Sequence, residues 1–105
     1  MHGNSKDNPN PHHLYNIFKR IDRDTFKFGI SDDPIDLEDG LSVRVREQID
    51  EWNMAAEYSK FDGEILLIDI PGRSAALEIE RSYIDTYYEK NGRNPIGNKY
   101  PKREL

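Results

Sequence analysis

The chain has 105 residues, no cysteine, 33% charged residues and a formal net charge of −5. This length fits a single domain with a modest core, and the lack of cysteine excludes disulfides and thiolate zinc sites. No apolar run is long enough to cross a membrane as a helix. The negative net charge argues against nucleic-acid binding over a broadly basic surface, so any such site must be a local basic cleft.

The N-terminal part of the chain predicts a tail followed by a β-hairpin. Residues 1–11 are rich in Asn and Pro and nearly lack apolar side chains, which is typical of a flexible tail or a linker from a longer chain. Two apolar segments with a short polar connection then predict a hairpin over residues 13–31. In its second strand, alternation places Phe26, Phe28 and Ile30 on one face.

An acidic segment and a helix follow the hairpin. Residues 31–40 hold five acids in ten positions, and they predict a solvated loop because the spacing of a calcium loop is missing. Residues 41–58 repeat apolar side chains at helical spacing. In this helix Arg44 and Gln48 lie at the edge of the apolar stripe, whereas Arg46 is expected to point to solvent.

The last two elements complete the order β-β-α-β-α. The apolar run at 63–72 predicts a buried strand, and residues 74–88 predict a helix that ends before Asn91 and Gly92. A basic irregular tail follows at 93–105. The sequence therefore predicts a small α+β domain in which helices flank a three-stranded, mostly antiparallel sheet.

Glu80 occupies an unusual position within the apolar face of the second helix. Its neighbours on that face include Leu77 and Ile84, whereas Glu78 lies on the charged side. Carboxylates are rarely buried unless they are paired or bind a metal. A groove-edge position, an arginine partner and a metal site all remain open on this pattern alone.

The two predicted hairpin strands resemble the motifs that define the GIY-YIG nuclease superfamily. The Gly-Ile-Tyr motif of that family matches His-Leu-Tyr at residues 13–15, and its Tyr-Ile-Gly motif matches Lys-Phe-Gly at residues 27–29. His13 thus replaces a glycine and Lys27 replaces a tyrosine. The resemblance implies a GIY-YIG-like nuclease domain over residues 12–105.

The helices carry the other matching positions. The helical arginine of the family matches Arg44, with Gln48 in place of the usual histidine. The metal-binding glutamate, with Ala four residues before it and Ile four residues after it, matches Glu80. The late asparagine of the family matches Asn98. The resemblance implies that Glu80 holds Mg²⁺ or Mn²⁺ as the only protein carboxylate.

The resemblance also assigns a role to each matched residue. Tyr15 would position or deprotonate the attacking water, and we expect Lys27 and Arg44 to lower its pKa. Arg44 would also bind phosphate oxygens as charge develops on them. The predicted catalytic residues are Tyr15, Lys27, Arg44 and Glu80. The predicted substrate-binding residues are Gln48, Asn98 and His13. Basic residues that could line a phosphate track are Lys19, Arg20, Arg23, Lys27, Arg44, Lys99, Lys102 and Arg103.

Residues 3–18 and 70–99 resemble C-terminal toxin domains of bacterial polymorphic toxins of the Rhs type. That resemblance implies delivery within a larger protein, action in the cytoplasm of a recipient cell and a cognate immunity protein. DNA is the favoured substrate over RNA, and the domain is expected to be monomeric. Two alternatives remain: a restriction, repair or homing nuclease, and an inactive relative that binds nucleic acid or protein.

Overall fold

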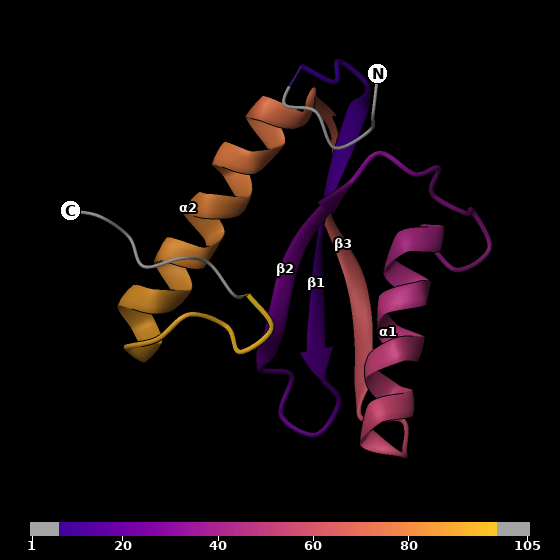
Figure 1. Cartoon of the computed structure of the whole chain (residues 1–105), viewed down its shortest axis with the longest axis vertical. Coiled ribbons are helices and arrows are strands. Elements are labelled where there is room, and N and C mark those ends of the chain that lie inside the picture. Colours follow the sequence, from indigo (N-terminus) through magenta and orange to yellow (C-terminus); the bar gives the residue numbers. More distant parts are fainter. Residues whose placement is uncertain (1–6, 99–105) are drawn as a thin grey trace.

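A computed structural model describes residues 7–98 and contains one three-stranded sheet with two helices (Figure 1). The elements are β1 (Pro11–Lys19), β2 (Thr25–Ser31), α1 (Val43–Ala56), β3 (Phe61–Pro71) and α2 (Arg73–Asn91). Both strand pairs are antiparallel, and the strand order β2-β1-β3 puts β1 in the centre. The predicted α+β fold is therefore confirmed. No helix in the described part of the chain is long and apolar enough to span a membrane.

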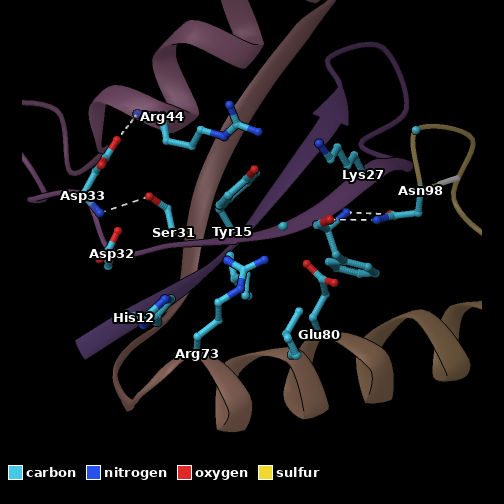
Figure 2. Close-up of a pocket in the computed structure, with 15 residues that line it drawn as sticks. His12, Tyr15, Lys27, Ser31, Asp32, Asp33, Arg44, Arg73, Glu80 and Asn98 are labelled. Carbon is cyan, nitrogen blue, oxygen red and sulfur yellow. Dashed lines mark hydrogen bonds between the residues drawn. The ribbon is translucent and has the colours of Figure 1, made fainter. Parts of the chain in front are cut away.

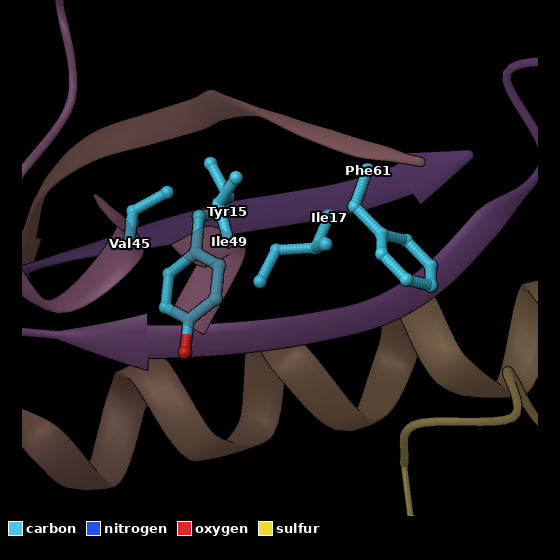
Figure 3. Packing of buried hydrophobic residues seen from close by; sticks show 5 residues of the cluster. All are labelled: Tyr15, Ile17, Val45, Ile49 and Phe61. Carbon is cyan, nitrogen blue, oxygen red and sulfur yellow. The ribbon is translucent and has the colours of Figure 1, made fainter. Parts of the chain in front are cut away.

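The central strand is covered on both faces, because its side chains alternate between the two helices. Tyr15 and Ile17 pack toward α1 and share a buried cluster with its side chains (Figure 3). Leu14 points to the other face, where it packs against Ala76 of α2. The members of the cluster on the α1 side are Tyr15, Ile17, Val45, Ile49 and Phe61. The helices therefore cover opposite faces of the sheet.

One detail of the hairpin was predicted wrongly. Phe26 does not share a face with Phe28: its ring lies 5.0 Å from that of Trp52 on the α1 side, whereas Phe28 packs against α2. The register between β1 and β2 shifts between Ile17 and Phe18, which leaves Phe26 as an extra residue in β2. Such a bulge re-aims the side chain that it contains.

The ends of the helices follow local sequence signals. The helix α2 ends at Asn91, and Gly92 adopts the left-handed conformation (φ 74°) that its predicted stop requires. The described structure also includes residues from the predicted tail. Asn8 is buried, its side chain donates to Asp32, and its carbonyl accepts from the amide of Arg73. Asn8 thus joins the segment before β1 to the loop after β2 and to the first residue of α2.

Candidate active site

A cavity of about 570 Å³ lies along the outer edge of β2 (Figure 2). Residues 27–33, from β2 and the loop after it, form one side of the cavity. Because β2 is an edge strand, side chains from helices on opposite faces of the sheet can meet there. The cavity brings together all four predicted catalytic residues, which come from four different elements. They are Tyr15, Lys27, Arg44 and Glu80.

Tyr15 reaches the cavity by crossing over Gly29. The Tyr15 side chain is only 1% exposed, and a β-carbon placed on Gly29 would overlap its phenol ring. Glycine is therefore required at this position so that a side chain from the central strand can pass across the edge strand. The Tyr15 hydroxyl donates a hydrogen bond to Oε1 of Gln48 at 3.0 Å.

Gln48 links two of the catalytic candidates. Its Oε1 accepts hydrogen bonds from the Tyr15 hydroxyl and from the Lys27 ammonium, both at 3.0 Å. The Gln48 side chain is buried and does not line the cavity. The predicted contact of Gln48 with substrate stays a prediction, and the contacts that the structure shows hold Tyr15 and Lys27 in place.

Burial dominates the titration of Tyr15 and Lys27. Desolvation raises the pKa of the Tyr15 phenol, the charge of Arg44 opposes this rise, and Glu80 adds to it. Our expectation of a lowered phenol pKa is therefore wrong, because the cost of burying a phenolate exceeds the effect of the nearby cation. Burial and the charge of Arg44 lower the pKa of the Lys27 ammonium, while Glu80 and Glu51 raise it.

Glu80 lies on the inward face of α2, as its helical position predicts. Its side chain is 5% exposed, and burial raises its pKa to about 7, against the charges of Lys27 and Arg73. Within residues 7–98 the Glu80 carboxylate forms no hydrogen bond and no ion pair shorter than 4.0 Å. The structure therefore does not show the arginine partner that the sequence left open. Its carboxylate oxygens are available to a ligand in the cavity.

The donor set around Glu80 fits a hard dication that keeps most of its waters. No group of three or more potential metal-ligating side chains occurs among the described residues. Glu80 would therefore act as a single protein carboxylate, as is common for Mg²⁺ and closely related ions. A bound cation would also offset the cost of keeping this carboxylate ionised in a buried position.

The two arginines of α1 have different surroundings. Arg44 lines the cavity, and its backbone amide donates to the carboxylate of Asp33. Arg46 lies away from the cavity and forms ion pairs of 2.7 Å with Asp39 and 3.8 Å with Asp36. The structure thus confirms that Arg44 and not Arg46 borders the inward side of α1 where the cavity lies. Arg46 is not simply solvated, however, because it holds the acidic loop.

Asn98 and His13 use their side chains for contacts within the protein. Asn98 donates to the Phe28 carbonyl at 2.8 Å and accepts from the Phe28 amide at 2.9 Å, so its side chain pairs with the open edge of β2. Asn98 also lines the cavity. Its two hydrogen bonds with Phe28 hold the segment after α2 against β2. His13 is buried outside the cavity, where its Nε2 is 2.9 Å from the hydroxyl oxygen of Ser42.

Among the five members of the predicted phosphate track that the structure describes, three do not line the cavity. Lys19 pairs with Asp22 at 3.2 Å, and Arg20 pairs with Asp62 at 3.6 Å. Arg23 lies over the ring of Phe18. Of the described members, Lys27 and Arg44 line the cavity. Three further members lie outside the described residues: Lys99, Lys102 and Arg103.

Arg73 and His12 are among the cavity-lining residues that the sequence analysis did not place in the site. Arg73 precedes Glu80 by seven residues, or about two helical turns, so the two share a face of α2. That spacing was visible in the sequence. His12 is buried, and its Nδ1 donates to the carbonyl of Asn10 at 2.7 Å. Only the tertiary structure places its ring beside the cavity.

Comparison with known proteins gives one family. The family described as URI fold toxin 2 matches residues 5–92, which include β1 to α2 and every cavity-lining residue except Gly97 and Asn98. No curated protein and no solved structure gives a significant match. The match spans most of the chain and ends at the C-terminal end of α2. The chain therefore belongs to the URI fold toxin 2 family and is a toxin domain.

Proposed function

We propose that this toxin domain is a metal-dependent endonuclease of the GIY-YIG type that hydrolyses phosphodiester bonds, with DNA as the favoured substrate. The observation that carries the proposal is the meeting of four chemically suitable side chains in one cavity. The set combines a phenol, two cations and an unpaired carboxylate. These residues are Tyr15, Lys27, Arg44 and Glu80. Membership of a toxin family supports a damaging enzymatic activity of this kind.

Each side chain can contribute to phosphodiester hydrolysis. Glu80 would hold Mg²⁺ or Mn²⁺, and such an ion supplies charge neutralisation and stabilises the leaving oxygen. The Tyr15 hydroxyl donates to Gln48, so its oxygen would accept a hydrogen bond from the attacking water and orient it. Arg44 and Lys27 would donate charged hydrogen bonds to the phosphate oxygens.

The biological setting that we propose follows from the toxin family and from the resemblance to Rhs-type toxins. The domain would be delivered as part of a larger protein and would act in the cytoplasm of a recipient cell. The producing cell would protect itself with an immunity protein that binds the domain. The isolated domain would act as a monomer, since the proposed chemistry uses residues of a single chain.

Cleavage assays with purified domain test this proposal directly. Plasmid DNA and a structured RNA would be incubated with Mg²⁺ or Mn²⁺, and parallel samples would contain EDTA. We expect metal-dependent cutting that Glu80→Ala abolishes and that Glu78→Ala, on the exposed side of the same helix, leaves intact. Cutting that persists in EDTA contradicts the role of Glu80, and cutting of RNA alone contradicts the favoured substrate.

One observation favours an inactive binding relative as the second candidate. The phenol of Tyr15 has a raised pKa, and its partner Gln48 cannot accept a proton, so Tyr15 is poorly suited to act as the general base. Binding of nucleic acid by the wild-type protein with no cutting in either metal ion supports this candidate. Any metal-dependent cutting that is lost in Glu80→Ala excludes it.

A further inference from the structure

Arg73 presents unused hydrogen-bond donors to the cavity. Its side chain projects from the first residue of α2 into the cavity, on the side of Tyr15 away from Lys27 (Figure 2). The guanidinium makes no hydrogen bond and no ion pair with any residue of the described range 7–98. Its Nε is shielded from solvent and has no hydrogen-bond partner among the residues that the structure describes.

The carboxylates near Arg73 do not provide that partner. Asp32 accepts hydrogen bonds from the side chains of Asn8 and Asn10, and Asp33 accepts from the backbone amide of Arg44. Glu80 shares the helix face of Arg73 but is not within ion-pair distance, so it affects the guanidinium only through its field. Arg73 as a whole is partly exposed, but a donor atom such as its Nε that is shielded from solvent and unpaired is costly, and native proteins normally satisfy such atoms.

A second orphaned nitrogen lies in the same wall. His12 donates from Nδ1 to the carbonyl of Asn10, and this contact leaves Nε2 as a buried lone pair with no partner among the described residues. Nε2 suits a water molecule or a hydroxyl group, whereas the five donors of Arg73 suit an anion. Two unsatisfied nitrogens in one wall indicate that this part of the cavity receives a polar ligand.

The chemistry of the cavity indicates which anion this is. Arginine forms two parallel hydrogen bonds to phosphate oxygens. Arg44 already supplies a guanidinium from α1, so the cavity has an arginine from the helix on each face of the sheet. A volume of about 570 Å³ lies within the range of cavities that hold whole drug-sized ligands, which gives room for more than one phosphate group.

We propose that Arg73 forms a second phosphate subsite, which binds the phosphate of the nucleic-acid strand next to the one that is cut. This inference rests on the proposed nuclease function and extends it to a substrate-binding residue outside the matched motif positions. Arg73 therefore contributes to affinity and to the register of the strand in the cavity, whereas the four proposed catalytic residues act on the phosphate that is cut.

Binding measurements in an inactive background test the subsite. Glu80→Gln protein in EDTA would be titrated into fluorescently labelled DNA and RNA of the same sequence, followed by anisotropy at several salt concentrations. Adding Arg73→Ala should weaken binding roughly tenfold and reduce the magnitude of the log–log salt slope by about one, the signature of one lost phosphate contact. Arg73→Lys should keep the slope, because it keeps the charge.

The control is Arg81→Ala, which removes an exposed arginine from the same helix and should change neither affinity nor slope. Thermal melts of every variant identify any loss of binding that comes from unfolding, and in that case Arg73→Gln and Arg73→Lys carry the comparison. If Arg73 only balanced the charge of Glu80, its removal would have no effect on binding in the Glu80→Gln background.

The outcomes separate this inference from the proposed function. Binding that is equally strong and equally salt-dependent in Arg73→Ala and Arg81→Ala overturns the subsite and leaves the nuclease proposal standing. A protein that neither binds nor cuts DNA or RNA overturns the nuclease proposal, and the subsite with it. A smaller salt slope in Arg73→Ala alone supports the subsite for whichever nucleic acid shows it.

Discussion

Replacing Glu80 with glutamine should stabilise the metal-free domain, and the gain should depend on pH. Burial raises the pKa of Glu80 from 4.5 to about 7. Below pH 4.5 the group is protonated in both the folded and the unfolded state, so it carries no penalty. Between pH 4.5 and about 7 the folded state keeps a proton that the unfolded state has lost, and the free energy of unfolding therefore falls as the pH rises.

The magnitude follows from the same two pKa values. A difference of about 2.5 pKa units corresponds to at most about 3 kcal/mol, and the whole penalty is present above pH 7. Glutamine resembles the protonated carboxyl group, so Glu80→Gln should raise the free energy of unfolding by up to about 3 kcal/mol at pH 8 and have little effect at pH 4. For a domain of this size, such a gain corresponds to roughly 10–20 °C in Tm.

Urea denaturation of wild type and Glu80→Gln in EDTA measures this difference at each pH. Glu78→Gln is the matched control, because Glu78 is exposed on the same helix and its replacement should give no pH-dependent difference. Adding Mg²⁺ or Mn²⁺ should stabilise the wild type and not Glu80→Gln. The reasoning fails if Glu80→Gln destabilises the protein by several kcal/mol at pH 8, since that result indicates a structural partner for the carboxylate.

Three further predictions concern the residues that shape the cavity. Arg44→Ala should lower the cleavage rate by a factor of roughly 10²–10³. Arg46→Ala should mainly lower Tm, because it removes the ion pair with the acidic loop. Equal losses of cleavage rate in the two variants would contradict this difference. Gly29→Ala should displace the Tyr15 ring, lower the free energy of unfolding by about 1–3 kcal/mol and reduce cutting. An unchanged Tm and unchanged activity would show that the ring can move aside. Asn98→Ala should lower the free energy of unfolding, measured by urea denaturation, by about 1–3 kcal/mol because it leaves backbone groups at the edge of β2 unpaired. A loss of activity without any loss of stability would instead indicate a direct contact with substrate.

Periodicity along the chain was sufficient to predict the elements and the direction of several side chains. The 3.6-residue repeat predicts that Glu80 points inward and that Arg44 lies at the edge of the apolar stripe, and the glycine after Asn91 predicts the end of α2. These features are local, because they depend only on residues within a few turns of one another. The same local rule links Arg73 to Glu80, although the sequence analysis did not use it.

Other properties depend on contacts between distant parts of the chain, and only the tertiary structure decides them. The pKa of Tyr15 rises because burial outweighs the charge of Arg44, and neither effect is visible in the spacing of the residues. Asn98 pairs with the backbone of Phe28, seventy positions earlier in the chain, and so becomes part of the sheet edge. The bulge that turns Phe26 toward α1 depends on the register between two strands, since strand alternation predicts a side-chain direction only while that register is regular.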